Sequence, residues 1–138
     1  MSKATDVAEL VGKTCVNVSI ACKGSYLLDD WITFLCSDGS SYEMFHKEDC
    51  CESVNIEDII GDLYDLVGSP ILMAEEATNS TDNPKREPGP YNDYESYSFT
   101  WTFYKFRTLK GDVTIRWYGS SSGYYSERVN FARVDEES

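Results

Sequence analysis

The chain has 138 residues, and its 12 Lys and Arg against 24 Asp and Glu give a formal net charge of −12. This charge repels the phosphate backbone of nucleic acids, so we expect no direct nucleic-acid binding. No segment approaches the roughly 18 apolar residues that cross a bilayer, and the N-terminus lacks the apolar stretch of a signal peptide. We therefore expect a cytoplasmic protein without a membrane partner.

The composition favours a single β-rich domain over residues 1–138. Aromatic residues make up 14% of the chain, and their alternation favours strands over helices. The five cysteines are an odd number in a chain without an export signal, so we expect reduced thiols. The predicted fold class is α+β, a mostly antiparallel sheet of about six strands in hairpins and a meander, packed by one short amphipathic helix.

The first predicted elements are a short helix and a strand. Residues 5–11 form a helix that is capped by Thr5 and ends at Gly12. Residues 13–22 alternate as a half-buried strand does. One face of this strand carries Val16, Val18, Ile20 and Cys22, and the other carries Cys15, Asn17 and Ser19.

A β-hairpin is predicted over residues 31–46. Two strand-like runs, at 31–36 and 41–46, flank the sequence Ser-Asp-Gly-Ser at 37–40. Asp-Gly between such runs is a strong hairpin signal, because Gly adopts positive φ without steric cost.

The amphipathic helix is predicted over residues 55–67. Its apolar positions recur at three- and four-residue steps, namely Ile56, Ile59, Ile60, Leu63 and Val67. Asn55 is a suitable N-cap, and Gly68 is a suitable C-terminal stop.

The segments after this helix are predicted to be extended. Residues 70–77 begin with a proline, which suits an edge strand. Residues 78–97 hold three of the four prolines and are expected to form a long surface loop.

The last third of the chain carries the clearest strand pattern. Phe99, Trp101 and Phe103 alternate with polar neighbours, and we expect these three rings to be turned away from solvent. A turn at 110–111 and a final strand over 124–134 complete a three-stranded meander, followed by an acidic tail at 134–138.

The densest group of reactive side chains comprises His46, Asp49, Cys50, Cys51 and Glu52. Imidazole and thiolate bind zinc, and a thiol beside an imidazole can act as a nucleophile. Adjacent side chains of an extended segment point to opposite faces, however, and the flanking carboxylates disfavour a thiolate. We therefore assign no metal, cofactor or catalytic residue, and we retain these five as candidate binding residues.

Arg116, Tyr118, Tyr124 and Tyr125 form a second candidate binding group. Strand alternation places Arg116 and Tyr118 on the face opposite Trp117, near the tyrosine pair across a short Ser- and Gly-rich connection. Arginine and tyrosine are enriched in recognition surfaces. The alternative is that these rings only cover the sheet.

Two segments, residues 46–71 and 100–131, resemble an uncharacterised family of small proteins encoded by bacteriophages and prophages. The shared strings are Asp-Cys-Cys-Glu at 49–52, Gly-Asp-Leu at 61–63, Gly-Ser-Pro-Ile at 68–71, Trp-Tyr-Gly at 117–119 and Gly-Tyr-Tyr-Ser at 123–126. The resemblance implies a phage context and no particular chemistry.

This context favours a small acidic accessory protein that binds a host protein stoichiometrically and inhibits, for example, a host defence system. Its acidity would also allow competition for a nucleic-acid-binding groove of that host protein. Two alternatives stay open. One is a binder of a small nucleotide-like signal molecule, and the other is a cysteine- or metal-dependent hydrolase centred on residues 46–52. The oligomeric state is left open by the sequence.

Overall fold

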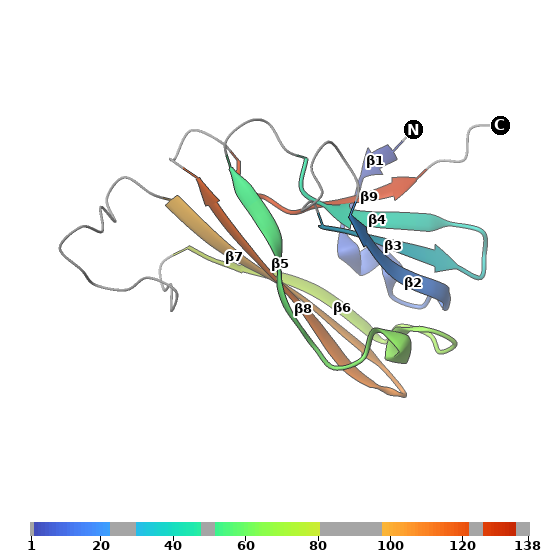
Figure 1. Cartoon of the computed structure of the whole chain (residues 1–138). Coiled ribbons are helices and arrows are strands. Elements are labelled where there is room, and N and C mark those ends of the chain that lie inside the picture. Colours follow the sequence, from blue (N-terminus) through green and yellow to red (C-terminus); the bar gives the residue numbers. More distant parts are fainter. Residues whose placement is uncertain (1, 23–29, 48–51, 81–97, 122–125, 135–138) are drawn as a thin grey trace.

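Two antiparallel sheets pack face to face in the computed structural model, which describes residues 2–22, 30–47, 52–80, 98–121 and 126–134 (Figure 1). The five-stranded sheet has the order β1 (Ser2–Ala4), β9 (Asn130–Val134), β4 (Ser41–Phe45), β3 (Asp30–Cys36) and β2 (Cys15–Cys22). The four-stranded sheet has the order β5 (Ser53–Ile60), β8 (Gly111–Ser121), β7 (Ser98–Thr108) and β6 (Met73–Asn79). The prediction of a mostly antiparallel sheet is confirmed, with more strands than expected.

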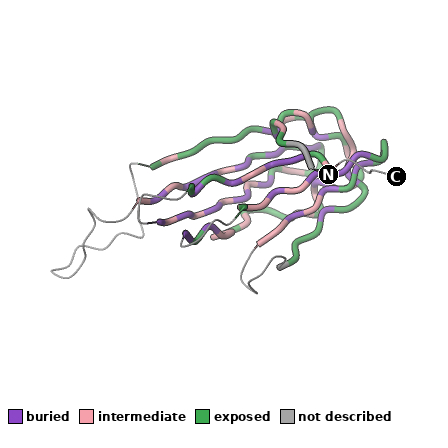
Figure 2. The backbone as a smooth tube through the Cα atoms, turned by 90° about the horizontal axis from the view of Figure 1, so that it is seen from above, coloured by how far each residue is buried: buried purple, intermediate pink, exposed green. Residues whose placement is uncertain are grey.

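The core lies between the two sheets. Buried and exposed positions alternate along the strands, as expected for sheets with one face against a core (Figure 2). From β8, the fully buried Trp117 donates its indole N–H to the Sδ atom of Met44 on β4, at 3.3 Å. The rings of Phe34 on β3 and Phe106 on β7 also meet across the core, with centroids 5.9 Å apart. Each such side chain contributes about 1.5–3 kcal/mol through burial.

The hairpin predicted over residues 31–46 is confirmed. The strands β3 and β4 are joined by a turn in which Cys36 N–H donates to the Ser40 carbonyl at 2.9 Å. Gly39 has a φ of 89°, in the left-handed region that favours glycine.

The amphipathic helix predicted over residues 55–67 is wrong. Strand β5 occupies the first part of this segment, and the short 3-10 helix η2 (Leu63–Leu66) follows it. The described part of the chain contains no α-helix, and none of its helical segments has the length and apolar character needed to cross a membrane.

A β-bulge explains why the spacing imitates a helix. The register of β5 against β8 shifts between Ile56 and Asp58. Ile56 and Ile59 therefore both face the core, although they are three positions apart and a regular strand would turn them to opposite faces. After the strand, Gly61 has a φ of 99°, and a Cβ atom there would lie 2.5 Å from the Asp112 carbonyl oxygen. The backbone turns sharply at this glycine.

The N-terminal predictions hold in part. The helix expected at residues 5–11 is the 3-10 helix η1 (Val7–Leu10), and its N-cap is Asp6 instead of Thr5. A second bulge, between Cys15 and Asn17 in β2, reverses the predicted faces at its start. Cys15 is consequently fully buried, whereas Val16 is 56% exposed.

The C-terminal strands pair differently from the prediction. β7 and β8 form the expected hairpin and β6 is the expected edge strand, but β9 joins the other sheet between β1 and β4, so the meander is wrong. β6 extends to Asn79, and Val134 is the last residue of β9. The rest of the predicted loop, from residue 81, and the tail from residue 135 lie outside the described residues.

Candidate functional site

His46 and Glu52 flank the connection between the two sheets. His46 follows β4 and Glu52 precedes β5, so the connection brings the two side chains together. The Nε2 atom of His46 lies 2.8 Å from Oε2 of Glu52, and its Nδ1 atom lies 2.6 Å from the carbonyl oxygen of Arg128. Both side chains are nearly fully buried, with exposed fractions of 6% and 0%.

The hydrogen bonds of His46 define what this pair can do. The Arg128 carbonyl can only accept, so Nδ1 carries a proton and donates it. The contact between Nε2 and the Glu52 carboxylate also needs one proton, which is bound either to Nε2 or to a carboxylate oxygen. Both ring nitrogens are therefore occupied, and the pair anchors the segment before β9. In this arrangement His46 presents no free nitrogen to activate a thiol.

Asp49, Cys50 and Cys51 lie outside the described residues. Within the described residues, no group of three or more His, Cys, Asp or Glu side chains could hold a metal ion. Cys15 and Cys36 are buried free thiols that form no disulfide. They lie at directly opposite positions of the neighbouring strands β2 and β3. Burial, reinforced by the neighbouring Cys36, raises the pKa of Cys15 to about 12, so its thiol stays protonated.

Arg116 and Tyr118 lie on the outer face of the four-stranded sheet, opposite Trp117, as alternation predicts. There they meet Trp101 and Phe103 of β7. The Trp101 ring lies 4.7 Å from the Tyr118 ring and 6.4 Å from the Phe103 ring, and the Arg116 guanidinium lies 5.5 Å from the Trp101 ring centre. We call these four residues the aromatic–arginine surface. Tyr124 and Tyr125 lie outside the described residues.

Acidic residues of β5 orient the arginine of this surface. The Nη2 atom of Arg116 lies 2.6 Å from Oε1 of Glu57 and 3.6 Å from Oδ2 of Asp58. Such pairs hold the planar guanidinium in one direction. The sequence predicts that Phe99, Trp101 and Phe103 are turned away from solvent, and Phe99 and Trp101 are indeed buried. Because of that prediction Trp101 and Phe103 are not among the candidate binding residues, but both lie on the outer face beside Arg116 and Tyr118.

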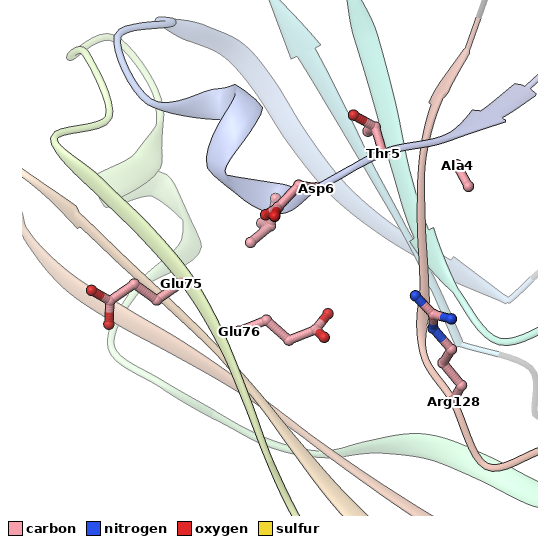
Figure 3. Close-up of a pocket in the computed structure, with 7 residues that line it drawn as sticks. Ala4, Thr5, Asp6, Glu75, Glu76 and Arg128 are labelled. Atoms are coloured by element: carbon pink, nitrogen blue, oxygen red, sulfur yellow. The ribbon is translucent and has the colours of Figure 1, made fainter.

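A groove lies between the edge strand β6 and the segment that joins β1 to η1 (Figure 3). It encloses about 640 Å³ and is lined by Ala4, Thr5, Asp6, Val7, Glu75, Glu76 and Arg128. An adjoining pocket of about 320 Å³ shares Glu76 and Arg128 and adds the hydroxyl side chains of Thr78, Thr100, Thr102 and Ser126. No motif in the sequence indicated this groove, because its residues come from three distant segments.

Glu127 forms a fixed wall of the adjoining pocket. It is 8% exposed, and its two carboxylate oxygens accept hydrogen bonds from Thr100 at 2.8 Å and Ser121 at 2.6 Å. Gly119 of β8 permits this position, because a Cβ atom there would lie 3.0 Å from the Glu127 carbonyl oxygen and from its Cβ atom. The first part of the predicted Ser- and Gly-rich connection is therefore not a loop, because strand β8 continues as far as Ser121.

Tyr104 of β7 is a neighbour of Glu76, which lines the groove. Its side chain is fully buried, and its hydroxyl has no hydrogen-bond partner among the described residues. Glu76 is its cross-strand neighbour and approaches the hydroxyl without reaching hydrogen-bonding geometry. Burial first, and then the Glu76 carboxylate, raise the pKa of Tyr104, so the hydroxyl keeps its proton.

Those candidate residues that the structure describes therefore fall in two separate places. His46 and Glu52 lie at the junction between the sheets, and Arg116 and Tyr118 lie on an outer face. No curated protein and no solved structure gives a significant match to the chain. A family model described as a domain of unknown function, DUF7448, matches residues 8–131. Because this match spans most of the chain, the protein belongs to the DUF7448 family.

Proposed function

We propose that this protein is a phage-type accessory protein that acts in the host cytoplasm by stoichiometric binding of a host protein, through the aromatic–arginine surface. The observation that carries the proposal is the contact group of Trp101, Phe103, Arg116 and Tyr118 on one face of a sheet. Tyr and Arg are among the residues that dominate the binding energy of protein interfaces, and Trp101, which is only 4% exposed, supports them from below the surface.

The strands and ion pairs that hold these side chains in place favour binding. All four come from neighbouring positions of the β7–β8 hairpin, with Trp101 opposite Tyr118 and Phe103 opposite Arg116. Glu57 and Asp58 hold the guanidinium in place before any partner arrives. A surface that is ordered in the free protein loses less conformational entropy on association.

The charge of the chain supports one class of partner. A net charge of −12 attracts a basic surface and speeds association with it. Nucleic-acid-binding proteins, including those of host defence, carry such surfaces. Competition with nucleic acid for this basic surface is the mode of inhibition that we propose.

Immobilised protein incubated with extract of a bacterial host tests the proposal. We expect one partner at near-equal stoichiometry, released by added DNA. Replacing Phe103 with Asp places a charge within the surface and should reduce recovery at least about tenfold. The matched control is Leu35→Asp, because Leu35 is 41% exposed on the outer face of the other sheet.

Arg116→Ala serves as a second variant, because Arg116 is partly exposed and its removal leaves the core intact. Circular dichroism checks the fold of each variant. Equal recovery with wild type, Phe103→Asp and Leu35→Asp would place the interface elsewhere, and failure to recover any partner would argue against stoichiometric protein binding.

A further inference from the structure

The groove holds opposite charges that face one another without pairing. The Arg128 guanidinium and the Glu76 carboxylate point toward each other across it (Figure 3). Within the described part of the chain, neither group forms an ion pair. The Asp6 carboxylate also enters the groove from the N-cap of η1.

The backbone keeps the two charges apart. The Arg128 carbonyl accepts from the buried His46, and the Arg128 N–H donates to the Ser126 hydroxyl at 3.2 Å. Glu76 is held by the pairing of β6 with β7. A ligand that spans the groove must therefore offer an anion to Arg128 and a cation to Glu76 and Asp6.

The Tyr104 hydroxyl is a second and independent sign of a ligand. Among the described residues no side chain or backbone group meets hydrogen-bond geometry with this buried hydroxyl, although the Glu76 carboxylate lies near it, and buried polar groups in this state are rare because each costs about 1–3 kcal/mol. Its charged neighbours Glu76, Arg128 and Asp6 all line the groove. A cation that draws the Glu76 carboxylate inward would let the hydroxyl donate to it.

The volume of the groove and the charges of its side chains indicate which class of ligand fits. The volume of about 640 Å³ lies within the range of small-ligand sites, about 300–1,000 Å³. A guanidinium favours a planar carboxylate, which it binds with two parallel hydrogen bonds. Asp6 and Glu76 outnumber Arg128, so a ligand with an additional positive charge is favoured over a neutral zwitterion.

We propose that the groove binds a basic amino acid, either free or as the C-terminal residue of a peptide. The carboxylate of the ligand lies on Arg128, and its side-chain cation lies between Glu76 and Asp6. His46 and Glu52 act here as positioning residues, because they fix the backbone of Arg128. This site is distinct from the aromatic–arginine surface, so either proposal can fail without the other.

Calorimetric titration of the full chain tests the ligand class with four probes. These are L-arginine, the peptide Gly-Gly-Arg, the same peptide with an amidated C-terminus, and L-glutamate. We expect at least one of the first two to bind, and the amide to bind about tenfold more weakly than the free acid. Tighter binding of L-arginine indicates a free amino acid, and tighter binding of the peptide acid indicates a chain terminus.

Three variants test the site. Glu76→Gln and Arg128→Gln should each weaken binding about tenfold. Asp112→Asn is the matched control, because it removes the same charge from an exposed position of β8 outside the groove, whereas Glu75, although its carboxylate points away from Arg128 (Figure 3), belongs to the lining. Tyr104→Phe should weaken binding without lowering the melting temperature of the free protein, since its hydroxyl forms no hydrogen bond with the described residues.

Three outcomes would overturn the proposal. One is no binding of either L-arginine or the peptide acid at millimolar concentration. Another is equal affinity for the acid and the amide. The third is an equal loss of affinity in Asp112→Asn and Glu76→Gln, which would indicate attraction by overall charge instead of a defined site.

Discussion

Asp38 has two roles in the turn between β3 and β4. One carboxylate oxygen accepts hydrogen bonds from the backbone N–H and the hydroxyl of Ser40, which shapes the turn. The other oxygen accepts from the Lys13 ammonium at 2.6 Å, which ties the turn to the start of β2. Lys13 first, and then Ser40, hold the pKa of Asp38 well below its usual value of 3.8.

Replacing Asp38 with Asn separates these roles, because the amide oxygen still accepts from Ser40 but carries no charge. A carboxyl whose pKa is lowered by folding stabilises the protein above its ordinary pKa, and this contribution is lost as the pH falls through the lowered value. The melting temperature of Asp38→Asn should therefore be lower than that of wild type at about pH 6, and the difference should shrink steadily as the pH falls below the ordinary carboxyl pKa of 3.8.

The matched control for this variant is Ser37→Ala, in the same turn. Melting curves recorded across the acid range provide the measurement. A difference between Asp38→Asn and wild type that stays constant with pH would assign the effect to the turn geometry and not to the ion pair.

At the scale of elements, local chemistry predicts the hairpins, and tertiary context decides the rest. The β3–β4 turn follows from Asp38 and Gly39 alone, because turn geometry depends on those residues. The bulge at Ile56 in β5 gives a strand the spacing of a helix, so periodicity predicts the wrong element. The partner of β9 is set by packing across the sandwich, which no local pattern encodes.

The junction between β4 and β5 carries a prediction of its own. His46→Ala removes one charged partner of a Glu52 side chain that is fully buried, and it also removes the donor to the Arg128 carbonyl. We expect the free energy of unfolding to fall by about 3 kcal/mol, as for other buried pairs that lose one member.

Urea denaturation measures this change. Lys47→Ala is the control, because Lys47 is the next residue and is exposed. A loss no larger than that of Lys47→Ala would mean that the pair does not anchor the junction.

At the scale of the whole molecule, the sandwich distributes its functional groups over two regions. Strand alternation alone predicts that Arg116 and Tyr118 share an outer face, because the period of a strand is fixed. The groove could not be predicted in this way, since Asp6, Glu76 and Arg128 are distant in sequence and meet only when the edges of the two sheets align. Glu76 in particular has no local signal that distinguishes it from other exposed acids.

The aromatic–arginine surface depends on residues 53–60 pairing with β8, because Glu57 and Asp58 orient Arg116 only from that position. The backbone NMR spectrum of the free protein tests this most directly. We expect extended Cα and Cβ chemical shifts over these residues and a cross-strand proton contact between Asn55 and Tyr118. Helical shifts over the same residues, with sequential amide contacts and no contact to β8, would contradict both the fold and the proposed surface.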